Sequence, residues 1–143
     1  MPSSDFDELI ERYHEALSKW PTGNFEPALK FFSERDDVTL ANPFGPAVRG
    51  WKRVADTIER AASNYRDGET IGFETTSKYA SPELAYLVEV ERYKAKIGGN
   101  DVITPVSLRV TSIFRREDGE WKLVHRHADP ITTTQQAGSV IRE

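Results

Sequence analysis

The chain has 143 residues, and 33 of them are Leu, Ile, Val or Phe, which is enough apolar material for a sizeable core. Its net charge of -4 argues against nucleic-acid binding, because proteins that contact phosphates usually carry a basic excess. The absence of cysteine excludes disulfides, thiolate metal sites and thiol nucleophiles. No apolar run approaches the roughly 20 residues that span a membrane, and the start of the chain lacks signal-peptide features. We therefore expect a cytoplasmic protein with no membrane partner.

The first half of the sequence predicts helices. Apolar residues at spacings of three and four predict a helix over 6–20, a shorter one over 27–33 and a third over 51–65. Gly68 is placed to end the third helix. A short strand is predicted over 37–41, between the second and third helices.

The second half changes to the alternating pattern of half-buried strands. The predicted strands cover 71–79, 84–97, 102–116 and 120–128. Helices followed by an antiparallel meander predict the α+β class, with the helices packed on one face of a curved sheet. No linker divides the chain, so we expect one domain over 1–143, with a core of about 5–130 and a C-terminal tail over 131–143.

The last predicted strand carries two of the three histidines. Residues two apart in a strand share a face, so Trp121, Leu123, His125 and His127 are expected to point together. Three interpretations remain open: structural histidines, imidazoles that line a pocket as hydrogen-bond partners or a general base, and metal ligands. His125, His127 and Asp129 are of the residue types that bind metals, but His125 and Asp129 lie about 13 Å apart along a straight strand. No metal is therefore expected.

The register of the last hairpin decides what faces these histidines. A three-residue loop over 117–119 is favoured because Glu-Asp-Gly suits a bulged turn. It places Thr111 opposite His125 and Arg109 opposite His127, and an inward Arg109 would attract carboxylate or enolate groups. A two-residue loop would instead turn another set to that face: Val110, Ser112 and Phe114.

Glu89 and Glu91 share one face of a predicted strand and could form a carboxylate pair for acid–base work. The favoured interpretation is that both are solvated or paired with nearby basic side chains. Their face stays open, because Pro105 in the next strand indicates a bulge or an edge.

Several segments together resemble the SnoaL-like and ketosteroid isomerase-like branch of the nuclear transport factor 2-like superfamily. They are 10–13 (Ile-Glu-Arg-Tyr), 42–45 (Asn-Pro-Phe-Gly), 49–51 (Arg-Gly-Trp) and 115–127, in matching order over about 6–130. The resemblance implies a conical barrel, with three N-terminal helices packed in a curved, mainly antiparallel sheet. It also implies a deep pocket and a homodimer.

The resemblance also assigns roles to individual residues. The tyrosine of the isomerases that donates to the oxyanion matches Tyr13, and their general-base aspartate falls on Asn42. Their protonated aspartate falls near Thr111 in the favoured register. An amide cannot take up a proton at neutral pH, so the chain is not expected to be a standard ketosteroid isomerase.

The sequence therefore leaves three alternative functions open. The first is a cofactor-free isomerase, cyclase or hydratase that acts by proton transfer on a small apolar or polyketide-like molecule. The others are a non-catalytic small-molecule binding protein and an oligomerisation module. The expected site residues are His127, His125 and Tyr13 for catalysis, and Asn42, Arg109, Thr111 and Trp51 for substrate binding.

Overall fold

The computed structural model describes residues 5–142. The helices are α1 (Asp5–Leu17), the 3-10 helix η1 (Trp20–Thr22), α2 (Glu26–Leu29), α3 (Trp51–Ala62) and the 3-10 helix η2 (Ala137–Val140). The strands are β1 (Thr39–Ala41), β2 (Val48–Arg49), β3 (Tyr65–Ala80), β4 (Leu84–Ile97), β5 (Thr104–Glu117) and β6 (Glu120–Asp129). None of the helices in this part of the chain is long and apolar enough to cross a membrane.

The α1 helix buries one face because its apolar residues recur at helical spacing. Acidic residues in its first turn stabilise the N-terminal end through the helix dipole. The buried residues are Phe6, Leu9, Ile10, Tyr13, Ala16 and Leu17. The helices predicted over 6–20 and 51–65 are confirmed as α1 and α3, each with an earlier end, and α2 is shorter than predicted.

Gly68 lies inside β3 and does not end a helix, so that part of the prediction is wrong. A Cβ atom at Gly68 would lie 2.4 Å from the carbonyl oxygen of Lys94 and 2.7 Å from the Cβ of Pro21. Glycine is needed here because β3 passes closely between β4 and η1.

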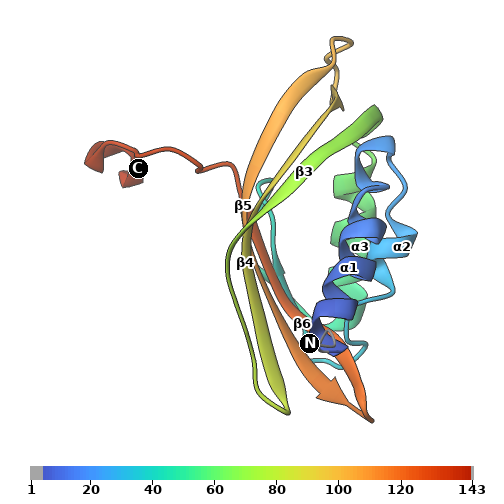
Figure 1. Cartoon of the computed structure of the whole chain (residues 1–143). Helices are drawn as coiled ribbons and strands as arrows, with labels where there is room; N and C mark the ends of the chain where they lie inside the picture. Colours follow the sequence, from blue (N-terminus) through green and yellow to red (C-terminus); the bar gives the residue numbers. More distant parts are fainter. Residues whose placement is uncertain (1–4, 143) are drawn as a thin grey trace.

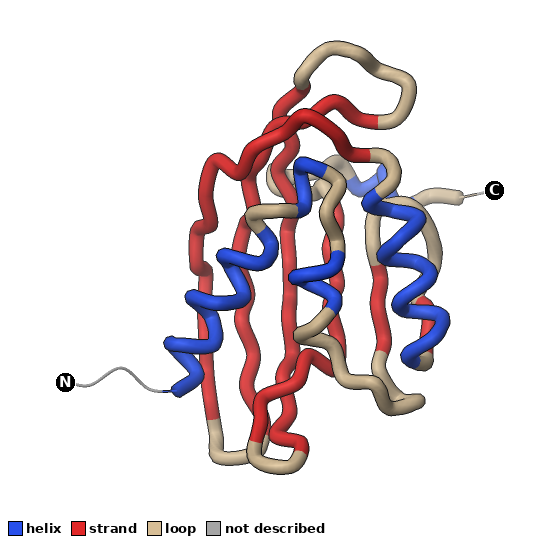
Figure 2. Tube along the Cα trace, turned by 90° about the vertical axis from the view of Figure 1, so that its right-hand side faces the viewer, coloured by secondary structure: helices blue, strands red, loops and turns tan. Residues whose placement is uncertain are grey.

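The six strands form one sheet in the order β2-β1-β6-β5-β4-β3. Neighbours run antiparallel except β1 and β6, which run parallel. The three α-helices pack on the inner side of the curved sheet (Figure 1), where they lie side by side (Figure 2). The predicted α+β class, with N-terminal helices in a curved, mainly antiparallel sheet, is confirmed. The segment over 130–142 leaves the sheet on the side away from the helices (Figure 1).

The hairpin between β5 and β6 has a two-residue turn, so the favoured three-residue loop is wrong. Glu117 pairs with Glu120, and Asp118 and Gly119 have φ values of 53° and 83°. A two-residue turn with both φ values positive matches the twist of the flanking strands, and aspartate tolerates this conformation better than most residues.

A β-bulge at Val124 changes the face on which the later residues of β6 lie. Phe114 pairs with Leu123 and Ile113 pairs with His125, so Val124 is an extra residue. After the bulge, the residues that point to the helices are Arg126 and Ala128, while the two histidines lie on the outer face. The prediction that Trp121, Leu123, His125 and His127 share one face is therefore wrong.

Candidate functional site

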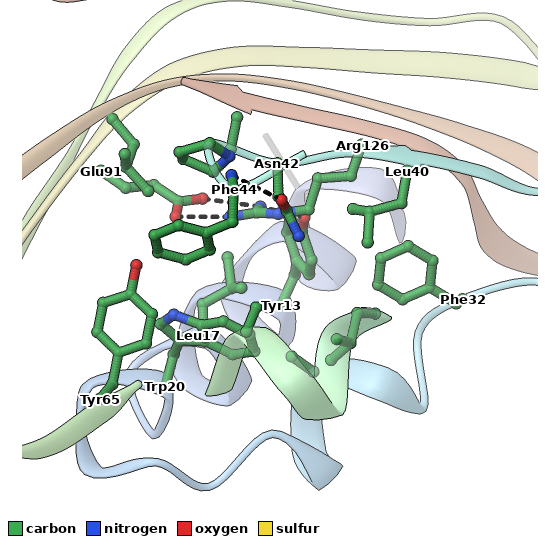
Figure 3. Close-up of a pocket in the computed structure, with 16 residues that line it drawn as sticks. Tyr13, Leu17, Trp20, Phe32, Leu40, Asn42, Phe44, Tyr65, Glu91 and Arg126 are labelled. Carbon is green, nitrogen blue, oxygen red and sulfur yellow. Dashed lines mark hydrogen bonds and ion pairs between the residues drawn. The ribbon is translucent and has the colours of Figure 1, made fainter. Parts of the chain in front are cut away.

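A cavity lies where the helices meet the inner face of β4, β5 and β6 (Figure 3). Its walls are mainly apolar, with contributions from Leu17, Trp20, Phe32, Leu40, Ile58 and Leu108. Its water-accessible volume is about 50 Å³. One water molecule needs at least about 10 Å³ of such space. The inner cavity, as we call it, thus has room for a few water molecules or one small chemical group.

Arg126 and Glu91 form the charged part of the cavity wall. Nη1 and Nη2 of Arg126 donate to Oε2 and Oε1 of Glu91 at 2.9 and 2.8 Å (Figure 3). The side chains are 12% and 6% exposed, so this two-pronged pair is largely excluded from water. Burial lowers the pKa of Arg126, but the charge interactions and hydrogen bonds with Glu91 and Tyr13 together outweigh burial and hold the pKa well above its ordinary value. The pair brings no net charge to the cavity.

Tyr13 presents its hydroxyl group at the same wall. Nη1 of Arg126 donates to Oη of Tyr13 at 2.7 Å, and Oη lies 2.9 Å from Oγ of Ser112. Burial raises the pKa of Tyr13, against the lowering effect of the Arg126 charge, so the hydroxyl keeps its proton at neutral pH. Because Arg126 supplies its own hydrogen to Oη, the tyrosine hydrogen is free to go to Ser112 or to a ligand oxygen.

Asn42 lines the mouth of the cavity, in the loop that follows β1. Its Oδ1 accepts the backbone N–H of Phe44 at 2.9 Å, which fixes a tight local turn. The amide nitrogen of Asn42 remains a donor and cannot act as a base.

A second buried carboxyl group lies beside the cavity, on β4. Oε2 of Glu89 is 2.7 Å from Nε2 of His14, whose ring stacks on Phe73 with centroids 3.9 Å apart. Oε1 of Glu89 is buried and has no hydrogen-bond partner among the described residues. Burial raises the pKa of Glu89, while the hydrogen bond from His14 lowers it. Neither Glu89 nor Glu91 is solvated, but Glu91 is paired with a basic side chain, which is the other alternative of the favoured interpretation.

The histidines expected in the pocket lie outside it. Nδ1 of His125 is 2.8 Å from Oγ1 of Thr39, and Nε2 of His127 is 2.8 Å from Oδ2 of Asp129. Burial and the nearby His127 lower the pKa of His125. Neither side chain lines the cavity, because the bulge at Val124 turns both to the outer face of β6. The prediction that they face the pocket is wrong.

Three other predicted residues also lie away from the cavity. Arg109 is exposed on the outer face of β5, where it pairs with a carboxylate of β6, so the inward orientation is wrong. Thr111 lies on the same outer face. Trp51 begins α3 and packs against the main core without reaching the cavity. Of the predicted site residues, the structure brings together Tyr13 and Asn42.

Sequence reasoning missed Arg126 and left the face of the two glutamates open. A signal for the glutamates exists, because charged side chains at alternate positions mark the outer face of β4: Arg92, Lys94 and Lys96. Continuing the same alternation toward the start of β4 places Glu91 and Glu89 on the inner face of the sheet. Arg126 carries no comparable signal, since its orientation depends on the bulge.

The site offers little support for a bound metal or a large cofactor. Within residues 5–142, no three His, Asp or Glu side chains are grouped so that they could hold a metal ion. The inner cavity alone, at about 50 Å³, is also too small to enclose a nucleotide or a flavin, which need pockets of several hundred Å³.

Solved structures show the same fold over nearly the whole chain. A ketosteroid isomerase-like protein from Erwinia carotovora atroseptica is 16% identical, with a TM-score of 0.72 over 89% of this chain and 94% of that one. A nuclear transport factor 2-like superfamily protein from Salmonella enterica is also 16% identical, with a TM-score of 0.72 over 93% of each chain. A protein of unknown function from Pseudomonas putida with the same type of fold is 20% identical, with a TM-score of 0.66 over 87% and 83% of the two chains. No curated protein sequence matches the chain.

The curled sheet over its helices is thus the fold of these solved structures, which include nuclear transport factor 2-like proteins. Residues 7–132 match the family described as the SnoaL-like domain, and the chain belongs to that family.

Proposed function

We propose that the inner cavity binds an uncharged apolar group that carries a carbonyl or hydroxyl oxygen, as in a small ketone or a polyketide-like molecule. The observation that carries this proposal is the buried hydroxyl of Tyr13 beside the neutralised pair of Arg126 and Glu91. The tyrosine supplies a hydrogen-bond donor, and the surrounding apolar walls favour a ligand without charge.

An anionic group is disfavoured at this position. Arg126 already directs both terminal nitrogens to Glu91, so a second carboxylate would have to displace Glu91 or lie beside it. Leaving Glu91 buried without its partner would cost several kcal/mol, on the order of 3–5.

Cyclohexanone is a suitable probe, because it combines an apolar ring with one acceptor oxygen. We expect it to change the fluorescence of Trp20, which lines the cavity, and to raise the melting temperature further as its concentration increases. Tyr13→Phe removes the donor and should weaken binding about 5- to 10-fold, the effect of one hydrogen bond.

The matched control is Tyr86→Phe, at an exposed tyrosine of β4, which should leave cyclohexanone binding unchanged. The proposal is overturned if cyclohexanone fails to bind, or if the two tyrosine variants bind it equally well. Cyclohexanone should also bind more tightly than the anion cyclohexanecarboxylate.

Proton-transfer catalysis is a second candidate for the same cavity. The favouring observation is Glu91, which is the one carboxylate among the described residues of its lining. Glu91 takes the place of the histidines as the candidate base, because those lie outside. The same cyclohexanone titration in deuterated water tests this function by measuring exchange of the hydrogens next to the carbonyl. Exchange that is lost in Glu91→Gln would support catalysis. Binding without exchange would indicate a binding protein without catalysis.

A further inference from the structure

Phe44 stands between the inner cavity and a second hollow on the surface. This outer hollow lies between the loop after β1 and the C-terminal half of α3. Asn42, Phe44 and Ala61 line both spaces. Figure 3 shows the Phe44 ring on the side of the inner cavity that also holds Glu91 and Tyr65.

The volumes of the two spaces indicate that they belong together. The inner cavity offers about 50 Å³ and the outer hollow about 450 Å³. Sites for small organic ligands typically measure about 300–1,000 Å³. A ligand of ordinary size that reaches Tyr13 therefore has to extend past Phe44.

The side chain of Phe44 lies outside the buried core. It is 54% exposed, and its ring lies 6.2 Å from that of Tyr65, centroid to centroid. Next to it, Gly45 faces open space, with no atom beyond its chain neighbours within 4 Å of the position of a Cβ. The hydrogen bond from the Phe44 N–H to Asn42 holds the backbone, so a rotation about χ1 can open the passage while the turn stays in place.

The polarity of the outer hollow differs from that of the inner cavity. Its lining contains one charged side chain, Arg60, and no carboxylate among the described residues. Nη2 of Arg60 donates to Oγ1 of Thr57 at 3.3 Å, and Asn64 lies nearby in the same lining. A guanidinium group has five N–H donors, so most of them remain for a ligand.

We propose that the inner cavity and the outer hollow form one two-part site, in which Phe44 is a movable partition that sets the length of the ligand. The site takes an elongated organic molecule with an uncharged apolar end inside and an anionic end, such as a carboxylate or sulfonate, at Arg60. This inference rests on the proposed function of the inner cavity.

The probe for the two-part site is 8-anilinonaphthalene-1-sulfonate, which joins apolar rings to one sulfonate and fluoresces when it is bound. Phe44→Ala opens the passage and should tighten its binding about 5-fold or more, while Phe44→Trp fills the passage and should weaken it. Cyclohexanone should compete with the dye.

Arg60→Gln should weaken dye binding about 3- to 10-fold and leave cyclohexanone binding unchanged. Ile71→Ala, at a similarly exposed side chain of β3, is the control and should have no effect on either probe.

The outcomes separate the two proposals. If cyclohexanone binds but Phe44→Ala leaves dye affinity unchanged, or if the dye binds without competition, the two-part site is refuted and the inner cavity stands. Dye binding that is insensitive to Arg60→Gln refutes the anionic end. If cyclohexanone does not bind the natural protein, the proposed function itself fails.

Discussion

Glu89 is a carboxyl group that is buried against a helix, and its neighbours set its response to pH. His14 of α1 contacts one oxygen, while Glu91 of β4 and Arg126 of β6 act on it through their charges. Burial is the largest effect and raises the pKa of Glu89 above its ordinary value of 4.5. The folded chain therefore holds this proton more tightly than the unfolded chain does.

This difference predicts that Glu89 makes the fold less stable as the pH rises. The stabilising contribution is complete below the unfolded pKa, near 4.5, and is lost as the pH rises through the higher folded pKa. Within that window the slope reaches at most about 1.4 kcal/mol per pH unit. Glu89→Gln cannot titrate, so urea unfolding at a series of pH values should show a flatter profile.

The matched variant for this measurement is Glu74→Gln, at an exposed carboxyl group of β3, which should retain the slope of the natural protein. Equal slopes in the natural protein and in Glu89→Gln would contradict the prediction.

At the scale of the element, β3 provides a comparison between two glycines on one strand. Gly68 lies against Lys94 and Pro21, whereas Gly72 has no atom within 4 Å of the position of a Cβ. Gly68→Ala should lower the free energy of unfolding by about 1–3 kcal/mol or more, because the backbone oxygen of Lys94 cannot give way easily. Gly72→Ala should leave stability unchanged or raise it by about 0.5–1 kcal/mol. Denaturant unfolding of both variants tests this; similar effects at the two positions would contradict it.

The elements differ in how far the sequence predicts them. The long helices α1 and α3 and the strand β4 follow from periodicity, because each has one clearly apolar face or a long apolar run. The parallel pairing of the short β1 with β6 leaves no local signal, because it joins residues far apart in the chain.

The candidate site is less predictable than the fold, for a physical reason. A strand side chain changes face with every residue, so one bulge reverses the assignment of everything after it. The hairpin turn and the bulge at Val124 together place Ser112 and Arg126 inside and the histidines outside. Tyr13 was predictable because a helix face depends on many residues and tolerates such local irregularities.

At the scale of the whole molecule, no helix within residues 5–142 packs against the outer face of the sheet (Figure 1). Tyr79 and Tyr86 stack there with centroids 5.8 Å apart, next to Val88 and Val90 on β4. A second copy of the chain could bury the same patch from both sides in a two-fold contact. The homodimer therefore stays a prediction, with this patch as its proposed interface.

Light scattering on the purified protein tests the homodimer. We expect a mass of twice the 16.2 kDa of one chain. Val88→Arg would place a charge in the middle of the patch and should yield monomers, while Val140→Arg, in the exposed C-terminal segment, should not. A monomeric natural protein would rule the dimer out.

Because Val124 is an extra residue in β6, its in-frame deletion would remove the bulge without replacing any side chain of the cavity. Leu123 would stay opposite Phe114 and His125 opposite Ile113, so Arg126 would still face the helices. Loss of the bulge at unchanged chain length would instead shift the residues after it by one position and turn the two histidines toward the helices. In chains with this fold, a bulge in this strand would thus decide whether a cation or imidazoles face the same ligand space.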